Sequence, residues 1–180
     1  MSATLFTAAH LACLPSDRDR FELVRGEMQR REPRGFARGV IASRADRSLR
    51  ACLPDGAGEV CAADTGFLLA TNPDTVLAPD VAFVRADRCR LADPESFFPG
   101  PPDLAVAVKS PRDTRAAPGR KAQLWLEFGC PLVLTIDPSR RTLTAWQPDG
   151  PPRHFTAGDE FADDSVISGL RIRAAERFPD

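Results

Sequence analysis

The sequence lacks the features that mark membrane proteins, secreted proteins and small metal-stabilised folds. No apolar run approaches the ~20 residues of a membrane-spanning helix, and the first 15 residues have no basic start of the kind found in signal peptides. The five cysteines are odd in number and scattered, and none has CxxC spacing, so neither a disulfide framework nor a zinc site is indicated. We therefore expect a cytoplasmic protein that has no membrane segment.

The chain also lacks an excess of charge of either sign. Its formal net charge is -1 and its pI is about 6.1, so any contact with DNA must use a local patch of basic residues. With 180 residues, 43% of them hydrophobic and 27% charged, the chain can bury a core of ordinary size. We expect one domain over residues 1–180, without internal repeats.

Lysine is the scarcest of the common charged residues. Only Lys109 and Lys121 occur among 24 basic residues, and they lie within one short stretch. Arginine brings positive charge to a surface as well as lysine does, whereas a compact ammonium that meets a phosphate, a carboxylate or a water as a point charge is harder to replace. The two lysines are therefore the first candidates for chemistry, the alternative being chance proximity.

Hydrophobic periodicity and turn residues predict an α/β protein with a mixed sheet flanked by helices. A hairpin is expected over residues 20–31 with its turn at Arg25-Gly26, and a strand–helix–strand unit over 103–137 implies a parallel pair. Residues 86–101 read as a surface excursion. Helices are predicted at about 7–14, 36–53 and 118–128; further strands are predicted at 58–63, at 66–70, just past Pro79-Asp80, and in a C-terminal meander over 141–147 and 152–157.

The strand at 103–109 is expected to present two different faces. One face is apolar and packed, and the other carries small residues between a carboxylate and an ammonium, which leaves room for a cleft; in order these are Asp103, Ala105, Ala107 and Lys109. Lys121 shares the apolar stripe of the following helix, so it either reaches outward to solvent or points into a site at the carboxyl end of that strand. The alternative for the strand is a small-residue face under a closely packed helix.

Several motifs together resemble a known nuclease family. Pro79-Asp80, followed about 27 residues later by a buried strand that ends in lysine, resembles the PD-(D/E)xK arrangement. The segments RFELVRGEM, DTGFLL, PDTVLAPDVAFV, PDLAVAVKSPRDT, RKAQLWLEFGCPLVLTIDP and TLTAWQPDG resemble, in this order, the Uma-type restriction endonuclease family. The similarity runs from about residue 18 to residue 172.

The resemblance implies a restriction-endonuclease-like fold and hydrolysis of DNA phosphodiesters that depends on Mg²⁺ or Mn²⁺. Carboxylates in such sites hold one or two hard divalent ions, which activate a water and stabilise charge on phosphorus. By the resemblance Asp80, Lys109, Lys121 and Glu22 are the catalytic residues, and Asp80 and Glu22 are also the metal ligands. A homodimer is expected for an enzyme that cuts two strands.

Two positions depart from the family pattern. Ala107 stands where the family has a glutamate, and Arg38 stands where its members tend to have a histidine before glycine. A methyl group cannot bind a metal ion, Asp103 lies four residues back on the same face, and Asp113 follows on a loop. We therefore expect weakened cleavage that Ala107→Glu would raise. The alternative is an inactive nuclease-fold module that binds nucleic acid or protein.

Other charged and aromatic residues receive plainer interpretations. Arg44, Arg47 and Arg50 lie on one predicted helix and form a candidate DNA-binding patch, although a solvated helix face is the simpler reading. A second group precedes it in the chain: Arg30, Arg31, Arg34 and Arg38. His10 and His154 are expected at the surface, and Trp125 and Trp146 in the core.

Overall fold

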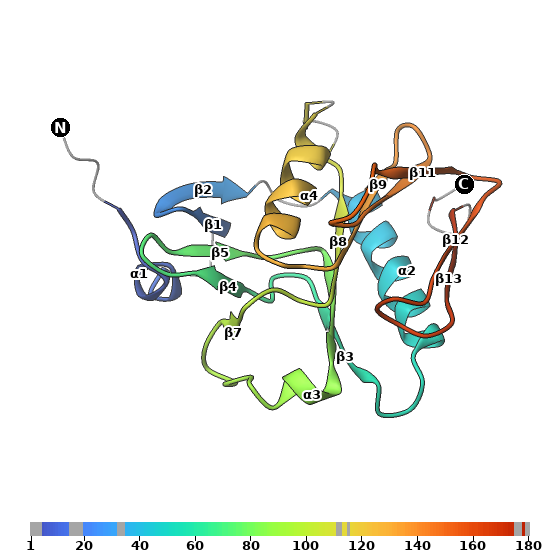
Figure 1. The fold of residues 1–180 in the computed structure, drawn as a ribbon. Helices are drawn as coiled ribbons and strands as arrows, with labels where there is room; N and C mark the ends of the chain where they lie inside the picture. Colours follow the sequence, from blue (N-terminus) through green and yellow to red (C-terminus); the bar gives the residue numbers. More distant parts are fainter. Residues whose placement is uncertain are drawn as a thin grey trace.

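A six-stranded mixed sheet forms the centre of the computed structural model, with one long helix on each face (Figure 1). The structure describes residues 5–14, 20–31, 35–110, 113–114, 116–174 and 178. The strand order is β11-β10-β9-β8-β6-β3. These strands are β3 (Gly58–Ala62), β6 (Val81–Arg85), β8 (Leu104–Val108), β9 (Leu132–Asp137), β10 (Thr142–Trp146) and β11 (Arg153–Thr156).

The predicted strand–helix–strand unit is the spine of this sheet. β8 and β9 pair in parallel, with Val108 opposite Ile136, and α4 (Ala117–Glu127) connects them. Pro118 lies in the first turn of α4, and Gly129 follows its end at a φ of +90°, a conformation that glycine adopts without a steric penalty. All five residues of β8 are buried, as expected for a strand covered on both sides.

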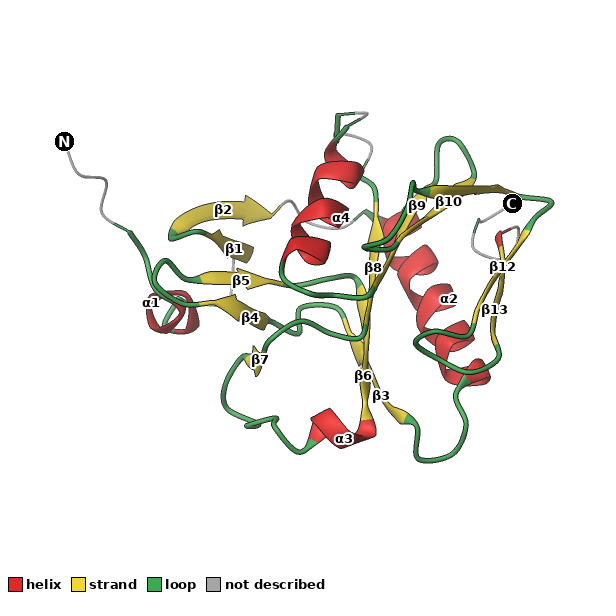
Figure 2. Cartoon of the chain, in the orientation of Figure 1, coloured by secondary structure: helices red, strands yellow, loops and turns green. Residues whose placement is uncertain are grey.

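A five-stranded sheet with the order β2-β1-β5-β4-β7 lies beside α4, and its outer edge is the predicted hairpin (Figure 2). Arg25 and Gly26 both have positive φ, 50° and 80°, as a tight two-residue turn requires. The strands are β1 (Arg20–Val24), β2 (Glu27–Arg31), β4 (Phe67–Ala70), β5 (Thr75–Leu77) and β7 (Phe98–Pro99); α1 (Ala8–Ala12) packs against β1.

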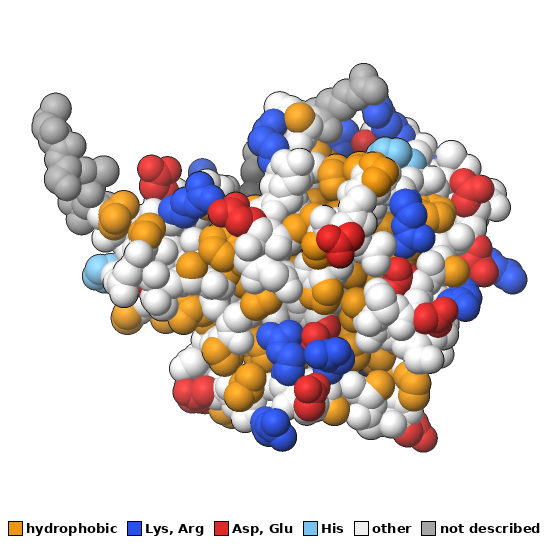
Figure 3. Space-filling view, in the orientation of Figure 1, with side chains coloured by type: hydrophobic (Ala, Val, Ile, Leu, Met, Phe, Trp, Pro, Cys, Tyr) orange, Lys and Arg blue, Asp and Glu red, His pale blue; other side chains and the backbone are white. Residues whose placement is uncertain are grey.

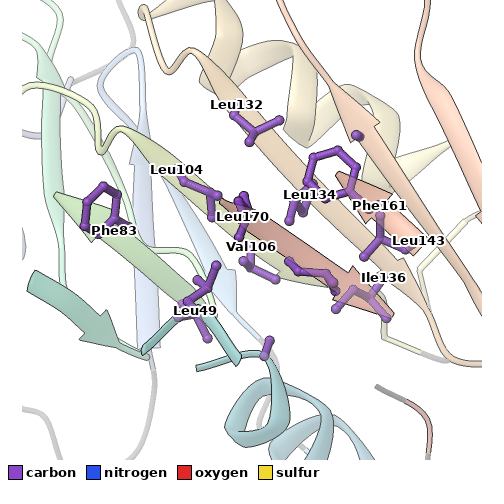
Figure 4. Packing of buried hydrophobic residues seen from close by; sticks show 14 of the residues in the cluster. Leu49, Phe83, Leu104, Val106, Leu132, Leu134, Ile136, Leu143, Phe161 and Leu170 are labelled. Carbon is purple, nitrogen blue, oxygen red and sulfur yellow. The ribbon is translucent and has the colours of Figure 1, made fainter. Parts of the chain in front are cut away.

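The alternating side chains of β8 divide the interior into two cores. Leu104, Val106 and Val108 pack with α2 (Phe36–Cys52) and with a small sheet of β12 (Glu160–Asp163) and β13 (Leu170–Arg173); Figure 4 shows Phe161 and Leu170 of that small sheet beside residues of β8 and β9. On the other face, Ala105 packs with Ala122 and Trp125 of α4. None of the helices in the described part of the chain is long and apolar enough to cross a membrane.

The structure confirms the mixed α/β architecture and corrects several details. The strands predicted at 58–63 and 66–70 are present, but β3 and β4 belong to different sheets. The meander does not end the fold, because β12 and β13 follow it. The excursion at 86–101 contains α3 (Ala86–Cys89) and β7, whose Phe98 is buried. β5 is only three residues long, too short to show a periodic pattern.

Candidate functional site

A polar pocket of about 220 Å³ opens at the carboxyl end of β8. It is bounded by the β1–β2 hairpin, the start of α2, the end of β8 and the start of α4; Figure 1 shows α4 between the hairpin and β8. Its lining brings together elements that are far apart in the sequence: Glu22, Arg30, Arg31, Arg38, Ala107, Val108, Lys109, Ser110, Asp113, Ala117, Pro118 and Lys121. Three of the predicted site residues, Glu22, Lys109 and Lys121, are therefore on its wall.

The fourth predicted residue, Asp80, lies directly behind this wall and is held by an arginine. It is 1% exposed, and its Oδ2 accepts a hydrogen bond of 2.7 Å from the Val108 N–H. Arg38 donates from Nε to Oδ1 at 3.2 Å and from Nη2 to Oδ2 at 3.0 Å. Both carboxylate oxygens therefore face a guanidinium fork, the geometry in which arginine binds carboxylates most strongly.

Glu22 on β1 is bound by the second lysine. Its carboxylate accepts hydrogen bonds from Lys121 Nζ at 2.9 and 3.0 Å and from the Ala78 N–H at 2.9 Å, and Arg31 Nε lies 3.7 Å away. Burial by itself raises the pKa of Glu22, but the charges of Lys121 and Arg31 and these hydrogen bonds outweigh it, so that the pKa lies below its ordinary value. Glu22 is thus ionised and already neutralised.

Lys121 projects from the first half of α4 into the same pocket. Burial lowers its pKa below the ordinary value, and the positive charge of Arg31 acts in the same direction, while Glu22 opposes both effects. Its neighbours Ala122 and Trp125 are fully buried, so α4 is fixed by its apolar side while the lysine meets Glu22. Of the two readings that the sequence left open, the structure favours the inward-pointing one.

Lys109 directly follows β8 and is paired with Asp137 at the end of β9. Lys109 Nζ lies 2.9 Å from Asp137 Oδ2, and the Lys109 N–H donates to the Ile136 carbonyl. Burial raises the pKa of Asp137, but the hydrogen bonds from Ser139 and Lys109 lower it by more, so the pKa lies below its ordinary value. Sequence reasoning missed Asp137, although two parallel strands that end together place the last residue of each side by side.

Ala107 is the position at which the pocket lacks a functional group. It is 8% exposed and lines the pocket, whereas Ala105, two residues back, is fully buried under α4. The small-residue face of β8 is thus packed at its middle and open at its end. Asp113 also lines the pocket, and its side chain accepts a hydrogen bond from the Ser110 N–H.

Asp103 is not part of this pocket. It lies at the opposite end of β8, where it accepts hydrogen bonds from the Arg85 N–H at 2.9 Å and from Arg88 Nη1 at 3.0 Å. The sequence placed Asp103 and Lys109 on one face correctly, but a strand of this length separates its two ends too far for them to share a site.

The side chains present do not fit a divalent metal ion. Magnesium sites use carboxylate oxygens and keep several waters, yet Asp80 and Glu22 are each bound by a cation and residue 107 ends in a methyl group. In the described part of the chain, no three His, Cys, Asp or Glu side chains are grouped so that they could hold a metal. The Mg²⁺ or Mn²⁺ site therefore stays a prediction that this donor set does not favour.

The other candidate residues have structural partners. Arg44 donates to the Phe178 carbonyl, and Arg50 donates to Asp46 and to the Val60 carbonyl, so these two α2 arginines are bound within the fold, while Arg47 is exposed. Arg34 lies outside the described residues. His10 is exposed and forms a capping box with Thr7, and His154 is exposed and contacts Thr144.

The two tryptophans differ in burial. Trp125 is fully buried in the core, as predicted, whereas Trp146 is only partly buried and donates from its indole N–H to Thr135. Figure 3 shows basic and acidic side chains interspersed on the displayed face, in line with the balanced net charge.

Comparison with known proteins adds a family and a fold. A family model, Uma2, described as "Putative restriction endonuclease", matches residues 8–175. A crystal structure of a putative nuclease belonging to DUF820 from Anabaena variabilis superimposes with a TM-score of 0.80, covering 96% of this chain and 97% of that one at 15% identity. No curated protein matches the sequence. At this identity the structural likeness shows the fold, and the family match covers nearly the whole described chain.

Proposed function

The chain belongs to the Uma2 family, whose description is "Putative restriction endonuclease", and we propose that its pocket binds a nucleic-acid phosphodiester while metal-dependent cleavage is greatly weakened. Family membership supports a nuclease function in general terms. The specific form of the proposal rests on one observation: the two carboxylates expected to bind metal are bound by Arg38 and Lys121, and the third position is Ala107.

The charge of the pocket supports an anionic ligand. Five cationic side chains line it, against two carboxylates on the wall and two more, Asp80 and Asp137, directly behind it. Basic side chains therefore outnumber acidic ones on the pocket wall, which favours an anionic ligand such as a phosphodiester. The volume, equivalent to about seven water molecules, admits a phosphate group and its ester oxygens.

The step that we expect to be slow is activation of the water that attacks the phosphate. A bound divalent ion would lower the pKa of a water and stabilise charge on the phosphate, a contribution of several kcal/mol. In this chain Lys109 and Lys121 can orient phosphate oxygens as ammonium groups, but each is already paired with a carboxylate. We therefore expect binding to survive and cleavage to be slower by about a thousandfold or more than in a complete site.

The proposal is tested by measuring binding and cleavage on the same protein. Fluorescence anisotropy with a labelled oligonucleotide of about 12 nucleotides, single-stranded or duplex, should show saturable binding. Cleavage of the same probe with Mn²⁺ should be at the detection limit. Rapid cleavage by the parent protein, comparable to that of a nuclease with a full set of carboxylates, would contradict the weakened site, and absence of binding to every probe would contradict the binding role.

Three finer expectations go with this proposal. The ligand is expected to be DNA, the protein is expected to act in the cytoplasm, and a homodimer is expected if both strands of a duplex are engaged. Sedimentation equilibrium with and without duplex DNA would measure the last of these. One chain in the free protein and one chain per bound duplex would exclude the dimer.

A further inference from the structure

We propose that the Arg38 guanidinium takes the place of a divalent ion in this pocket, so that a phosphodiester is bound there without metal. This inference rests on the proposed nucleic-acid binding and gives it a chemical form: Arg38 is the cation that neutralises Asp80 and also faces the ligand. The side chains of the pocket then do not suit a metal ion for two reasons: Arg38 occupies the Asp80 carboxylate, and Ala107 offers no ligand.

The position of the guanidinium carries the inference. Asp80 is buried, and both of its oxygens are bound by Arg38 at 3.2 and 3.0 Å. Arg38 also lines the pocket, with a side chain that is only 15% exposed. A metal ion in a nuclease bridges carboxylate oxygens on one side and phosphate oxygens on the other. Arg38 spans the same two sides, with Asp80 behind it and the pocket in front.

The hydrogen-bonding capacity of arginine allows both contacts at once. Of the five N–H groups of a guanidinium, Nε and one on Nη2 are used by Asp80. The others are on hand for oxygens of a phosphate, which arginine binds through two parallel hydrogen bonds. Lys109 and Lys121, which line the same pocket, add point charges to the same ligand.

The electrostatics of Asp80 explain why a metal would not simply displace the arginine. A buried carboxylate needs a cation, and a guanidinium remains charged at any pH a protein tolerates. Arg38 is covalently attached and fixed by the helix, so an ion must expel it into the pocket before reaching Asp80. Ala107→Glu alone would add a carboxylate beside a guanidinium that already neutralises its neighbour. We therefore expect Ala107→Glu to raise cleavage only when Arg38 is replaced as well.

The first arm of the test is calorimetric titration with Mn²⁺ of four proteins: the parent, Ala107→Glu, Arg38→Gln and the double variant. We expect the double variant to bind Mn²⁺ at least about tenfold more tightly than Ala107→Glu. Asp80→Ala in the double variant should abolish that binding. Equal affinity of Ala107→Glu and the double variant would overturn the inference, because Arg38 would then present no obstacle to the ion.

The second arm measures binding of a labelled single-stranded DNA of about 12 nucleotides in EDTA and in Mg²⁺. The parent should bind equally in both, and Arg38→Gln should bind about tenfold more weakly. Arg90→Gln removes an exposed arginine at the end of α3, outside the pocket, and should have no effect. Binding by the parent only in Mg²⁺ would overturn the inference while leaving nucleic-acid binding intact. Absence of binding in both buffers would overturn the proposed function, and the Mn²⁺ arm would still decide whether Arg38 blocks the ion.

A folding control keeps both arms interpretable. Arg38→Lys retains the charge beside Asp80 but not the fork, so it keeps the carboxylate neutralised if Arg38→Gln does not fold. We expect Arg38→Lys to bind DNA in EDTA several-fold more weakly than the parent. Undiminished affinity in a folded Arg38→Lys protein would contradict the role of the fork.

Discussion

The two ends of β8 carry the same kind of ion pair and use it differently. At the carboxyl end Arg38 binds Asp80 and also lines the pocket. At the amino end Arg88 binds Asp103, and it also donates to the Pro101 carbonyl at 2.6 Å and lies over the Phe98 ring at 5.6 Å. The second arginine thus joins a loop to the sheet with its remaining donors, whereas the first faces open space.

This difference shows what separates a structural ion pair from a candidate site. Both aspartates are buried, at 1% and 4% exposure, and both are bound by a guanidinium at 3.0 Å. Burial is therefore similar at the two ends, and each aspartate is bound by an arginine, although Arg38 binds Asp80 through two hydrogen bonds and Arg88 binds Asp103 through one. Open volume in front of the arginine and two lysines in the same pocket are found only at the Arg38 end, and these support the proposed ligand site.

The largest expected difference between the two ends is in stability. Arg38→Met should lower the free energy of unfolding by about 3–5 kcal/mol, because it leaves the buried Asp80 carboxylate without its bidentate partner. Arg88→Met should have a smaller effect, since Arg85 Nε remains 3.3 Å from Asp103. Urea denaturation of both variants measures this. Equal losses would show that the second arginine at the amino end does not compensate.

The coupling between Arg38 and Asp80 is the next largest effect. The double variant Asp80→Asn/Arg38→Met removes both charges, so it should be more stable than the sum of the single losses predicts, by about 2 kcal/mol. The same cycle at Asp103 and Arg88 should give a smaller coupling energy. Additive losses at Asp80 and Arg38 would mean that the observed fork contributes little in solution.

Binding should respond at one end only. Lys109→Met should weaken binding of the DNA probe several-fold and reduce the salt dependence of log K by about one unit, because it removes a contact to phosphate. Arg85→Met removes a positive charge at the other end of the sheet and should leave the affinity unchanged. Anisotropy titrations at several salt concentrations separate the two. A similar loss in both variants would indicate a diffuse electrostatic effect of the whole surface.

The smallest effect is the pH dependence of Glu22. Its pKa is lowered in the folded state, so its stabilising contribution is fully present above the ordinary value of 4.5 and is lost as the pH falls through the folded pKa. The difference in unfolding free energy between the parent and Glu22→Gln should therefore be constant from about pH 7 to about pH 5 and shrink below that. A difference that grows on acidification would contradict the assigned sign. Asp113→Asn, on an exposed pocket residue, serves as the control.

Much of the fold was predictable because local signals agreed with it. Arg25-Gly26 is a turn dipeptide between two short strands, and residues 103–137 combine two apolar runs with a helix bounded by proline and glycine. The prediction failed where local sequence does not decide pairing. β3 and β4 are separated by only four residues, yet they join different sheets. β12 and β13 are short strands that pair only with each other, and nothing in their local sequence marks this pairing.

The site was predictable in part, for a different reason. Scarcity singled out Lys109 and Lys121, and the family resemblance supplied Asp80 and Glu22, which the structure brings to one region. The pairing of these residues was not predictable from sequence. Arg38 was noticed as a departure, but its contact with Asp80 spans 42 residues and depends on how α2 crosses the sheet. The roles assigned to the four residues stay predictions.

The short connection between the two large sheets, residues 78–80, gives Glu22 and Asp80 a second, structural role. The Ala78 N–H binds Glu22 of one sheet, while the Asp80 backbone and side chain bind Val106 and Val108 of the other. Residues 78–80 thus connect the two sheets, and the Glu22 and Asp80 carboxylates, which are the acids expected at a nuclease site, also fix this connection. A related chain without nuclease activity would still need both acids to hold the two sheets together. The presence of these two acids in a sequence is therefore explained by the connection alone, whereas the residue at position 107, which takes no part in the connection, distinguishes a complete metal site from an incomplete one.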